Sequence, residues 1–298
     1  MTSTRIRSRR VWLGVGVAAL VTAGGAEALP DAAANQASAA PSADSFSARP
    51  LLLAEAAPPH NHGAAAPGQG GEGGEGGESG GSSLPANIKF LRDIGLIRGH
   101  LLVGNELAGE GHWSEGLPHF LHPVEEIYEA IRRPLKEKHM ADFDAALKAL
   151  AQTVKSRKRE AYDAAWERVD ARLNEIERAE KAAAGAHWPQ TTVATVLALL
   201  QSATGEYGQA IEKGRIAKPV EYQDSRGFVF YAGKLLASVS GDLAKINPEA
   251  AGSLTSVLGG LKAAWPTAVP PPKPVMDHAA VLAATSRFEL AAGPFLNN

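Results

Sequence analysis

Apolar residues recur at helical spacing from Leu84 to the end of the chain, and no segment of this region alternates in the manner of a strand. The clearest stripe, at spacings of four, three, four and three residues, consists of Tyr162, Trp166, Val169, Leu173 and Ile176. A second stripe, one helix earlier, consists of Phe143, Leu147, Leu150 and Val154. Such stripes predict amphipathic helices, and the charged residues on their other faces are typical of solvated surface without a catalytic role.

Clusters of Gly and Pro divide this region into about eight helices. The predicted helices span residues 86–108, 114–133, 140–156, 158–183, 189–213, 219–243, 248–264 and 275–290. Short connections favour antiparallel neighbours, so the sequence predicts an all-α, up-and-down helical bundle. Eight helices can form one elongated bundle or two four-helix units, and no clean internal repeat decides between these arrangements.

Residues 1–28 have the anatomy of an export signal peptide. A basic start precedes an apolar run from Val11 to Val21 and a small-residue cleavage signal at residues 26–28. This run is shorter than a membrane span requires, so we expect no stable span after cleavage. Residues 8–13 (Ser-Arg-Arg-Val-Trp-Leu) look like a twin-arginine motif, and the alternative is an ordinary secretory signal with an Arg-rich start. We expect a periplasmic protein, and because twin-arginine export moves folded proteins, often with a cofactor, the motif favours a metalloprotein.

Residues 29–83 are rich in Ala, Pro, Ser, Gly and Glu and contain few large apolar side chains. Such a segment buries too little surface to offset the entropy of ordering, which predicts a disordered linker. Within it, His60 and His62 are better explained as solvated histidines than as a loose metal site. The helical bundle domain is therefore predicted to span residues 84–298.

Charge and cysteine content exclude several classes of function. The formal charge of −2 divides into +3 for residues 1–28, −5 for residues 29–83 and zero for residues 84–298. A neutral domain lacks the basic surface that binds nucleic acid, so we expect no nucleic-acid partner. The chain has no cysteine, which excludes disulfides, thiolate metal sites and thiol catalysis.

The first predicted helix is apolar on nearly every side and contains His100. His100 shares a helix face with Leu96 and Val103, so its imidazole is expected to point into the packed interior. Gly99 and Gly104 lower helix propensity, which indicates that another helix or a ligand approaches closely there.

The second predicted helix gathers the strongest polar signal. His119, His122 and Glu126 fall within about 60° of one another on one helix face. In the absence of thiolates, imidazole and carboxylate groups are the ligands of iron, copper, zinc and nickel. Pro123 removes the backbone hydrogen bond to the carbonyl of His119 and is expected to kink the helix at the histidines. These three residues and His100 form a predicted metal site, and the alternative is a hydrogen-bonded polar network or an exposed face.

Further polar residues are candidates to support this site. Tyr128, Glu125, Glu106 and Asp224 are expected nearby. Asp224 and Glu221 lie one turn apart on a later helix, where they can add oxygen ligands or hold an imidazole N–H. The competing role is a structural pairing with Arg226 or Arg98, favoured for Glu221 and left open for Asp224.

These residues also carry a family resemblance. The motifs are Gly99-His100-Leu101-Leu102-Val103-Gly104, His119-x-x-His122-Pro123-x-x-Glu126-x-Tyr128 and Glu221-Tyr222-Gln223-Asp224-x-x-Gly227-Phe228. They resemble a group of largely uncharacterised exported bacterial helical proteins over most of residues 86–290. More distantly, the chain resembles the imelysin-like periplasmic helical bundles, which include the iron-binding component of a ferrous-iron uptake system. That family's G-x-H-x-x-E motif corresponds here to His122 through Glu125, with Phe120 in place of Gly.

Enzyme motifs are absent from residues 84–298: there is no G-x-S-x-G elbow, no H-E-x-x-H, no phosphate-binding G-x-x-x-x-G-K and no Rossmann glycine pattern after a strand. We therefore expect a protein that is not an enzyme. The first hypothesis is an exported bundle that binds a transition metal (iron, copper or zinc) as a carrier, sensor or uptake component. The second is a metal-free structural or interaction protein that binds a cell-envelope partner.

Overall fold

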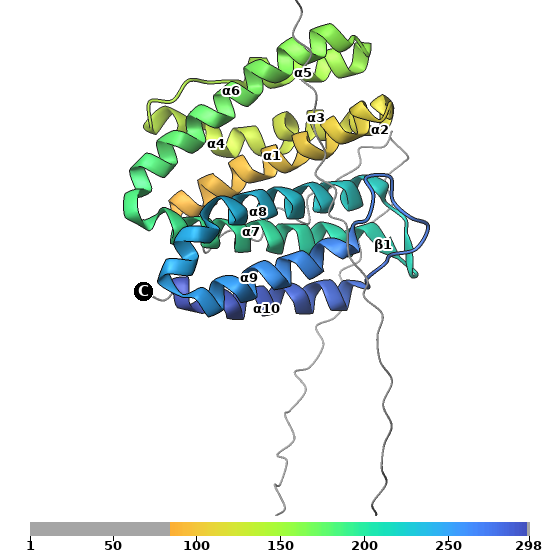
Figure 1. Ribbon diagram of the computed structural model, residues 1–298. Helices are drawn as coiled ribbons and strands as arrows, with labels where there is room; N and C mark the ends of the chain where they lie inside the picture. The colour runs from red at the N-terminus through yellow and green to blue at the C-terminus, as the bar shows by residue number, and fades with distance from the viewer. Residues whose placement is uncertain (1–83, 297–298) are drawn as a thin grey trace, which may run out of the picture. The chain divides into compact units, whose positions relative to one another are not determined.

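The computed structural model describes residues 84–296, and the predicted export signal and linker lie outside them (Figure 1). The described helices are α1 (Ala86–Gly109), α2 (Trp113–Gly116), α3 (Pro118–His122), the π-helical η1 (Pro123–Ile127), α4 (Tyr128–Glu137), α5 (Asp144–Ser156), α6 (Arg159–Ala184), the 3-10 turn η2 (Gly185–His187), α7 (Trp188–Ala210), α8 (Pro219–Ile246), α9 (Pro248–Leu261), the 3-10 turn η3 (Lys262–Ala264) and α10 (His278–Leu296). The predicted all-α helical bundle is confirmed. Among these helices, none is both long enough and apolar enough to cross a membrane.

The helix boundaries depart from prediction at several positions, and the last helix, predicted at 275–290, spans His278–Leu296. Pro134 was expected to end a helix, but α4 continues to Glu137 because the buried Leu135 anchors its last turn. The helix predicted to reach residue 213 ends at Ala210, where a short hairpin begins. In that hairpin β1 (Ile211–Glu212) pairs antiparallel with β2 (Arg215–Ile216) through a turn whose Lys213 and Gly214 have φ of 50° and 72°. Positive φ at both central residues is the geometry of a tight hairpin turn.

Helices α7 to α10 form a four-helix unit, and α1 packs across α7 and α8 (Figure 1). Short helices α2 to α4 pack against α1, while α5 and α6 pair with each other on the side of α1 away from α10. One cluster of buried apolar residues runs from Phe90 in α1 to Phe295 in α10, so these helices share a continuous core. Both predicted apolar stripes belong to it, with Trp166 half-buried at its edge.

The contact between α1 and α8 depends on two glycines. A Cβ atom added to Gly227 would overlap the carbonyl group of Gly99, and one added to Gly99 would lie 2.5 Å from the Phe228 ring. The two backbones therefore touch, as the glycine in α1 predicted. Gly99 precedes His100 by one residue and Gly227 follows Asp224 by three, so this contact places the imidazole beside the carboxylate.

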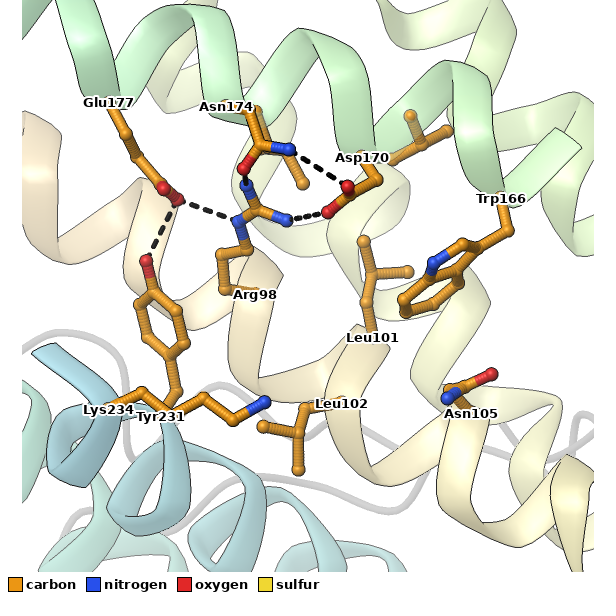
Figure 2. A pocket seen from close by; sticks show the side chains of 12 residues that line it. Arg98, Leu101, Leu102, Asn105, Trp166, Asp170, Asn174, Glu177, Tyr231 and Lys234 are labelled. Carbon is orange, nitrogen blue, oxygen red and sulfur yellow. Dashed lines mark hydrogen bonds and ion pairs between the residues drawn. The ribbon is translucent and has the colours of Figure 1, made fainter. Parts of the chain in front are cut away.

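Arg98 joins α1 to α6 on another face of α1 (Figure 2). Its guanidinium donates to Glu177 Oε1 at 2.7 Å, to Asn174 Oδ1 at 2.6 Å and to Asp170. The Tyr231 hydroxyl of α8 donates to the same Glu177 oxygen at 2.8 Å. The Arg98 side chain is only 12% exposed, so this network fixes α6 against α1 and α8. The predicted pairing of Arg98 with Asp224 or Glu221 is wrong, because the carboxylates of α6 occupy the guanidinium.

We expect the Arg98→Met variant to lower the free energy of unfolding by about 3 kcal/mol, because it leaves Asp170 and Glu177 without their cation. Arg132→Met is the matched control, since Arg132 is 47% exposed and pairs with Glu129 on the surface. That change is expected to cost less than about 1 kcal/mol in urea denaturation. Equal losses for the two variants would contradict the role of Arg98.

We expect Gly227→Ala to lower the free energy of unfolding by about 1–3 kcal/mol, because the added methyl group pushes α8 away from Gly99. Gly241→Ala on the same helix is the control, since an added Cβ there meets nothing within 4 Å. That variant should match or exceed the parent in stability, owing to the better helix propensity of Ala. Urea denaturation of both proteins measures the difference, and a harmless Gly227→Ala would refute the contact.

Candidate metal centre

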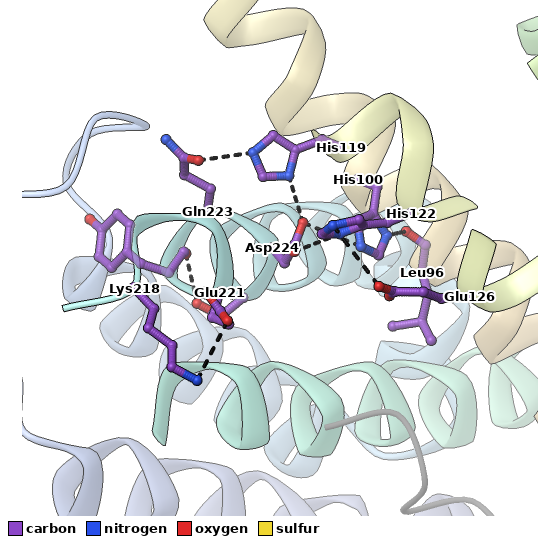
Figure 3. Close-up of polar contacts among 11 residues, drawn as sticks. Leu96, His100, His119, His122, Glu126, Lys218, Glu221, Gln223 and Asp224 are labelled. Atoms are coloured by element: carbon purple, nitrogen blue, oxygen red, sulfur yellow. Dashed lines mark hydrogen bonds and ion pairs between the residues drawn. The ribbon is translucent and has the colours of Figure 1, made fainter. Parts of the chain in front are cut away.

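Three imidazoles and one carboxylate meet between three helices (Figure 3). Helix α1 supplies His100, α3 supplies His119 and His122, and α8 supplies Asp224. The prediction that His100 points into the interior is confirmed, because the residue is fully enclosed. Helix α3 approaches α1 closely at Gly104, where an added Cβ would lie 2.7 Å from the Phe120 ring and 3.2 Å from His119 Cβ. Both predicted glycine contacts of α1 therefore shape this site.

Asp224 lies at the centre of the cluster. Its Oδ1 is 2.7 Å from His119 Nδ1 and 3.3 Å from His100 Nε2, and its Oδ2 is 3.2 Å from His122 Nδ1. Burial by itself raises the pKa of this carboxyl group. The positive field of His119 and the hydrogen bonds from His119 and His122 overcome that effect and hold the pKa of Asp224 well below its usual range. Asp224 is therefore a buried anion.

His119 uses both ring nitrogens within the protein. Nδ1 donates to Asp224 Oδ1, and Nε2 lies 2.9 Å from the side-chain amide of Gln223. The ring is completely buried. With both nitrogens occupied, His119 orients the carboxylate of Asp224 and is not placed to bind a metal ion itself.

His100 presents a free lone pair to the centre of the site. Its Nδ1 lies 2.9 Å from the carbonyl oxygen of Leu96, which can only accept, so Nδ1 carries the proton. Burial lowers the pKa of His100 to about 4, against the raising effect of Asp224 and with further lowering by His122 and His119. The neutral ring therefore turns an unprotonated Nε2 toward Asp224 Oδ1, 3.3 Å away.

His122 and Glu126 form the side of the site nearest to solvent. His122 Nε2 and Glu126 Oε1 lie 4.0 Å apart, and the two side chains are 21% and 35% exposed. Partial burial raises the pKa of Glu126; His122 opposes this, whereas the negative fields of Asp224, Glu125 and Glu221 add to it. Glu125 and Glu221 therefore add negative charge at the solvent-exposed side of the site.

The backbone beside these residues is π-helical. Pro123 has no N–H to bond with the carbonyl of His119, and the chain forms the wide turn η1 from Pro123 to Ile127. The predicted irregularity at Pro123 is thus observed, and π-helical turns are frequent at functional sites.

The ligand atoms of His100, His122 and Asp224 lie within 4.8 Å of one another, so these three residues can share one metal ion. Two imidazoles and a carboxylate suit iron, zinc and copper. Of the predicted ligands, the structure brings His100 and His122 together with Asp224, places His119 behind the carboxylate and leaves Glu126 at the rim.

Two residues predicted to support the site lie elsewhere. The Tyr128 hydroxyl accepts a hydrogen bond from the backbone N–H of Phe143 at 2.6 Å, on the side of the helix away from the histidines. Glu106 forms an ion pair with Arg226, so the predicted pairing of Arg226 with Asp224 or Glu221 is wrong. Glu221 Oε1 lies 3.8 Å from Lys218 Nζ, and this pairing agrees with the structural role favoured for Glu221.

Sequence reasoning missed Gln223 and left the role of Asp224 open. Their only local signal is position: both precede Gly227 on the helix that α1 touches. Glu125 lies at the surface beside Glu126 and helps to raise the pKa of Glu126.

Residues 183–293 match the family described as the iron permease-associated 4-helix bundle domain. The match covers the four helices α7 to α10 and includes Gln223 and Asp224, whereas the three histidines lie before it. No curated protein matches the chain, and no solved structure does. The family match relates the C-terminal part of the chain to a helical family connected with iron uptake, and the imelysin-like resemblance stays a prediction.

Proposed function

We propose that this protein is an exported metal-binding component of an iron-uptake system. His100, His122 and Asp224 would hold the ion, with Glu126 at its solvent side. The observation that carries this proposal is the approach of His100 Nε2 to Asp224 Oδ1, which puts a nitrogen lone pair and a carboxylate oxygen 3.3 Å apart in a buried site.

Two electron-rich atoms at this distance need a positive charge between them. The hydrogen bond from His100 Nδ1 to the Leu96 carbonyl is itself a feature of metal-binding histidines, which commonly donate their second N–H to a backbone carbonyl. A metal ion bound to His100 Nε2 and Asp224 would remove the repulsion between these two atoms. The ligand atom of His122 lies within 4.8 Å of those of His100 and Asp224, so His122 could bind the same ion.

The surroundings favour reversible loading over permanent burial of the ion. His100 and Asp224 are enclosed, but His122 and Glu126 reach solvent, and Glu125 lies beside them. Carboxylates at this partly exposed edge of the site attract cations. This arrangement supports a carrier or uptake component, and no residue in the site is arranged as a nucleophile with its base, which favours binding over catalysis.

The match to an iron permease-associated domain supports iron as the ion and a membrane permease as the partner. The twin-arginine-like start supports export to the periplasm, where such a partner would be met. We infer that the bundle presents the ion to the permease from the periplasmic side.

We expect Asp224→Asn to weaken metal binding at least about 100-fold, because the amide removes the charge at the centre of the site. His100→Gln should have a similar effect, whereas His119→Gln should cost about tenfold by loosening Asp224. Calorimetric titration of the metal-free protein with Fe(II), Zn(II) and Cu(II) measures these affinities, with His187→Gln as an exposed control.

The metal site would be refuted if the protein bound none of the three ions and if none of them raised its thermal unfolding midpoint. It would support a metal-free structural role in which His119, Gln223 and Asp224 form a polar core. At a metal concentration of 100 times Kd, binding should instead add about 2.7 kcal/mol to the free energy of unfolding.

We expect the double change Arg9→Lys and Arg10→Lys to lower the periplasmic yield at least about tenfold if export follows the twin-arginine route. Arg5→Lys with Arg7→Lys is the control, because it leaves the arginine pair intact. Fractionation of cells with quantitative immunoblotting gives the yield, and normal export of the Arg9 and Arg10 variant would indicate an ordinary secretory signal.

A further inference from the structure

A groove between α6 and α8 lies apart from the metal site. Its two adjoining cavities have volumes of about 750 Å³ and 270 Å³ and share Asn174, Glu177, Tyr231 and Lys234 in their walls. Figure 2 shows the smaller cavity, with the Arg98 network above and Lys234 extending from α8 toward Leu102. The larger cavity runs to Trp188 at the start of α7.

The larger cavity is lined by three cations that have no anionic partner. Arg178 and Lys181 come from α6 and Lys234 from α8, and among residues 84–296 no carboxylate lies within 4.0 Å of their charged nitrogens. Arg178 donates through Nε to the Asn174 carbonyl at 3.1 Å, which leaves its terminal nitrogens available. Positive charge therefore faces the cavity from both sides.

The one acidic group in the wall does not cancel this charge. Glu177 Oε1 accepts from Arg98 at 2.7 Å and from the Tyr231 hydroxyl at 2.8 Å, so its negative charge is already compensated. Asp242 is the carboxylate that acts on Lys181, but it lies outside the wall and is paired with Lys245 at 2.7 Å. Arg98 also pairs with Asp170, so one cation compensates two carboxylates, and the groove keeps an excess of about two positive charges, which attracts anions.

The remaining wall is mainly apolar or aromatic, with Ala171, Trp188, Leu235 and the ring of Tyr231, and it includes the polar side chains of Asn174 and Ser238. Cations on opposite sides of such a surface fit a ligand with a carbon skeleton and an anionic group at each edge. An inorganic anion would leave the apolar wall uncovered, and a monocarboxylate would reach the cations on one side only.

We propose that this groove binds a small organic polycarboxylate, held by Arg178 and Lys181 on α6 and Lys234 on α8. Guanidinium and ammonium groups form their strongest hydrogen bonds with carboxylates. The groove and the proposed metal site are independent, because α1 lies between them. His100 faces α3 and α8, whereas Arg98 faces α6.

Tricarballylate, a tricarboxylate that lacks the chelating hydroxyl group of citrate, is the probe. Calorimetric titration of the full-length, metal-free protein should give saturable binding at one site. Lys181→Gln with Lys234→Gln should weaken it at least about tenfold, because charge-assisted hydrogen bonds are lost. Lys136→Gln with Lys155→Gln is the matched control, since both lysines are exposed, lie outside the groove and carry the same total charge.

No saturable binding, or equal weakening by the two double variants, would overturn the proposal, as would acetate or phosphate binding as tightly as tricarballylate. The Asp224→Asn variant separates this proposal from the metal site: it should lose metal and keep tricarballylate affinity. Quenching of fluorescence that disappears in Trp188→Phe would place the bound ligand at the predicted wall.

Discussion

A buried carboxylate with three imidazoles around it is the constraint on which this structure depends. An isolated Asp in an apolar core is costly, and it stays ionised only where donors and positive charge compensate it. Asp224 obtains hydrogen bonds from His119 and His122, which both belong to α3, and His100 of α1 encloses it from the other side. These hydrogen bonds fix α3 against α8, and the backbone contact between Gly99 and Gly227 fixes α1 against α8.

The sequence predicted which histidines lie together, but it did not predict that Asp224 lies at the centre of the site. Helical periodicity shows which residues share a face, so His100 was correctly placed in the interior and His119 beside His122. Periodicity cannot tell which distant residue meets that face, and Asp224 lies 105 positions from His119. The meeting depends on backbone contact between Gly99 and Gly227, which only the packing of the two helices reveals.

Tyr128 shows a second limit of sequence reasoning. It follows the histidines in the same motif, with the π-helical turn η1 between them. At about 100° per residue a regular α-helix places Tyr128 about 180° from His119, and its hydroxyl accepts a hydrogen bond from the backbone N–H of Phe143 instead of reaching the site. Pro123 predicted that the helix is irregular, but the form of the irregularity depends on how α3 and α4 pack against α1.

The overall bundle was predictable because apolar stripes alone determine which helix faces are buried.

The candidate site combines residues from the part of the chain that matches the family and from the part that precedes the match. The matched helices α7 to α10 provide Asp224 and Gln223, but the imidazoles come from α1 and α3, before the match begins. A four-helix unit of this kind therefore supplies only the anionic side of the site, and an ion bound between the two parts would join them. Since α1 also carries Arg98, which fixes α6, the same helix connects the metal site to the cationic groove through opposite faces. The position of α1 is therefore fixed from two sides, by the backbone contact between Gly99 and Gly227 and by the hydrogen bonds of Arg98 to α6.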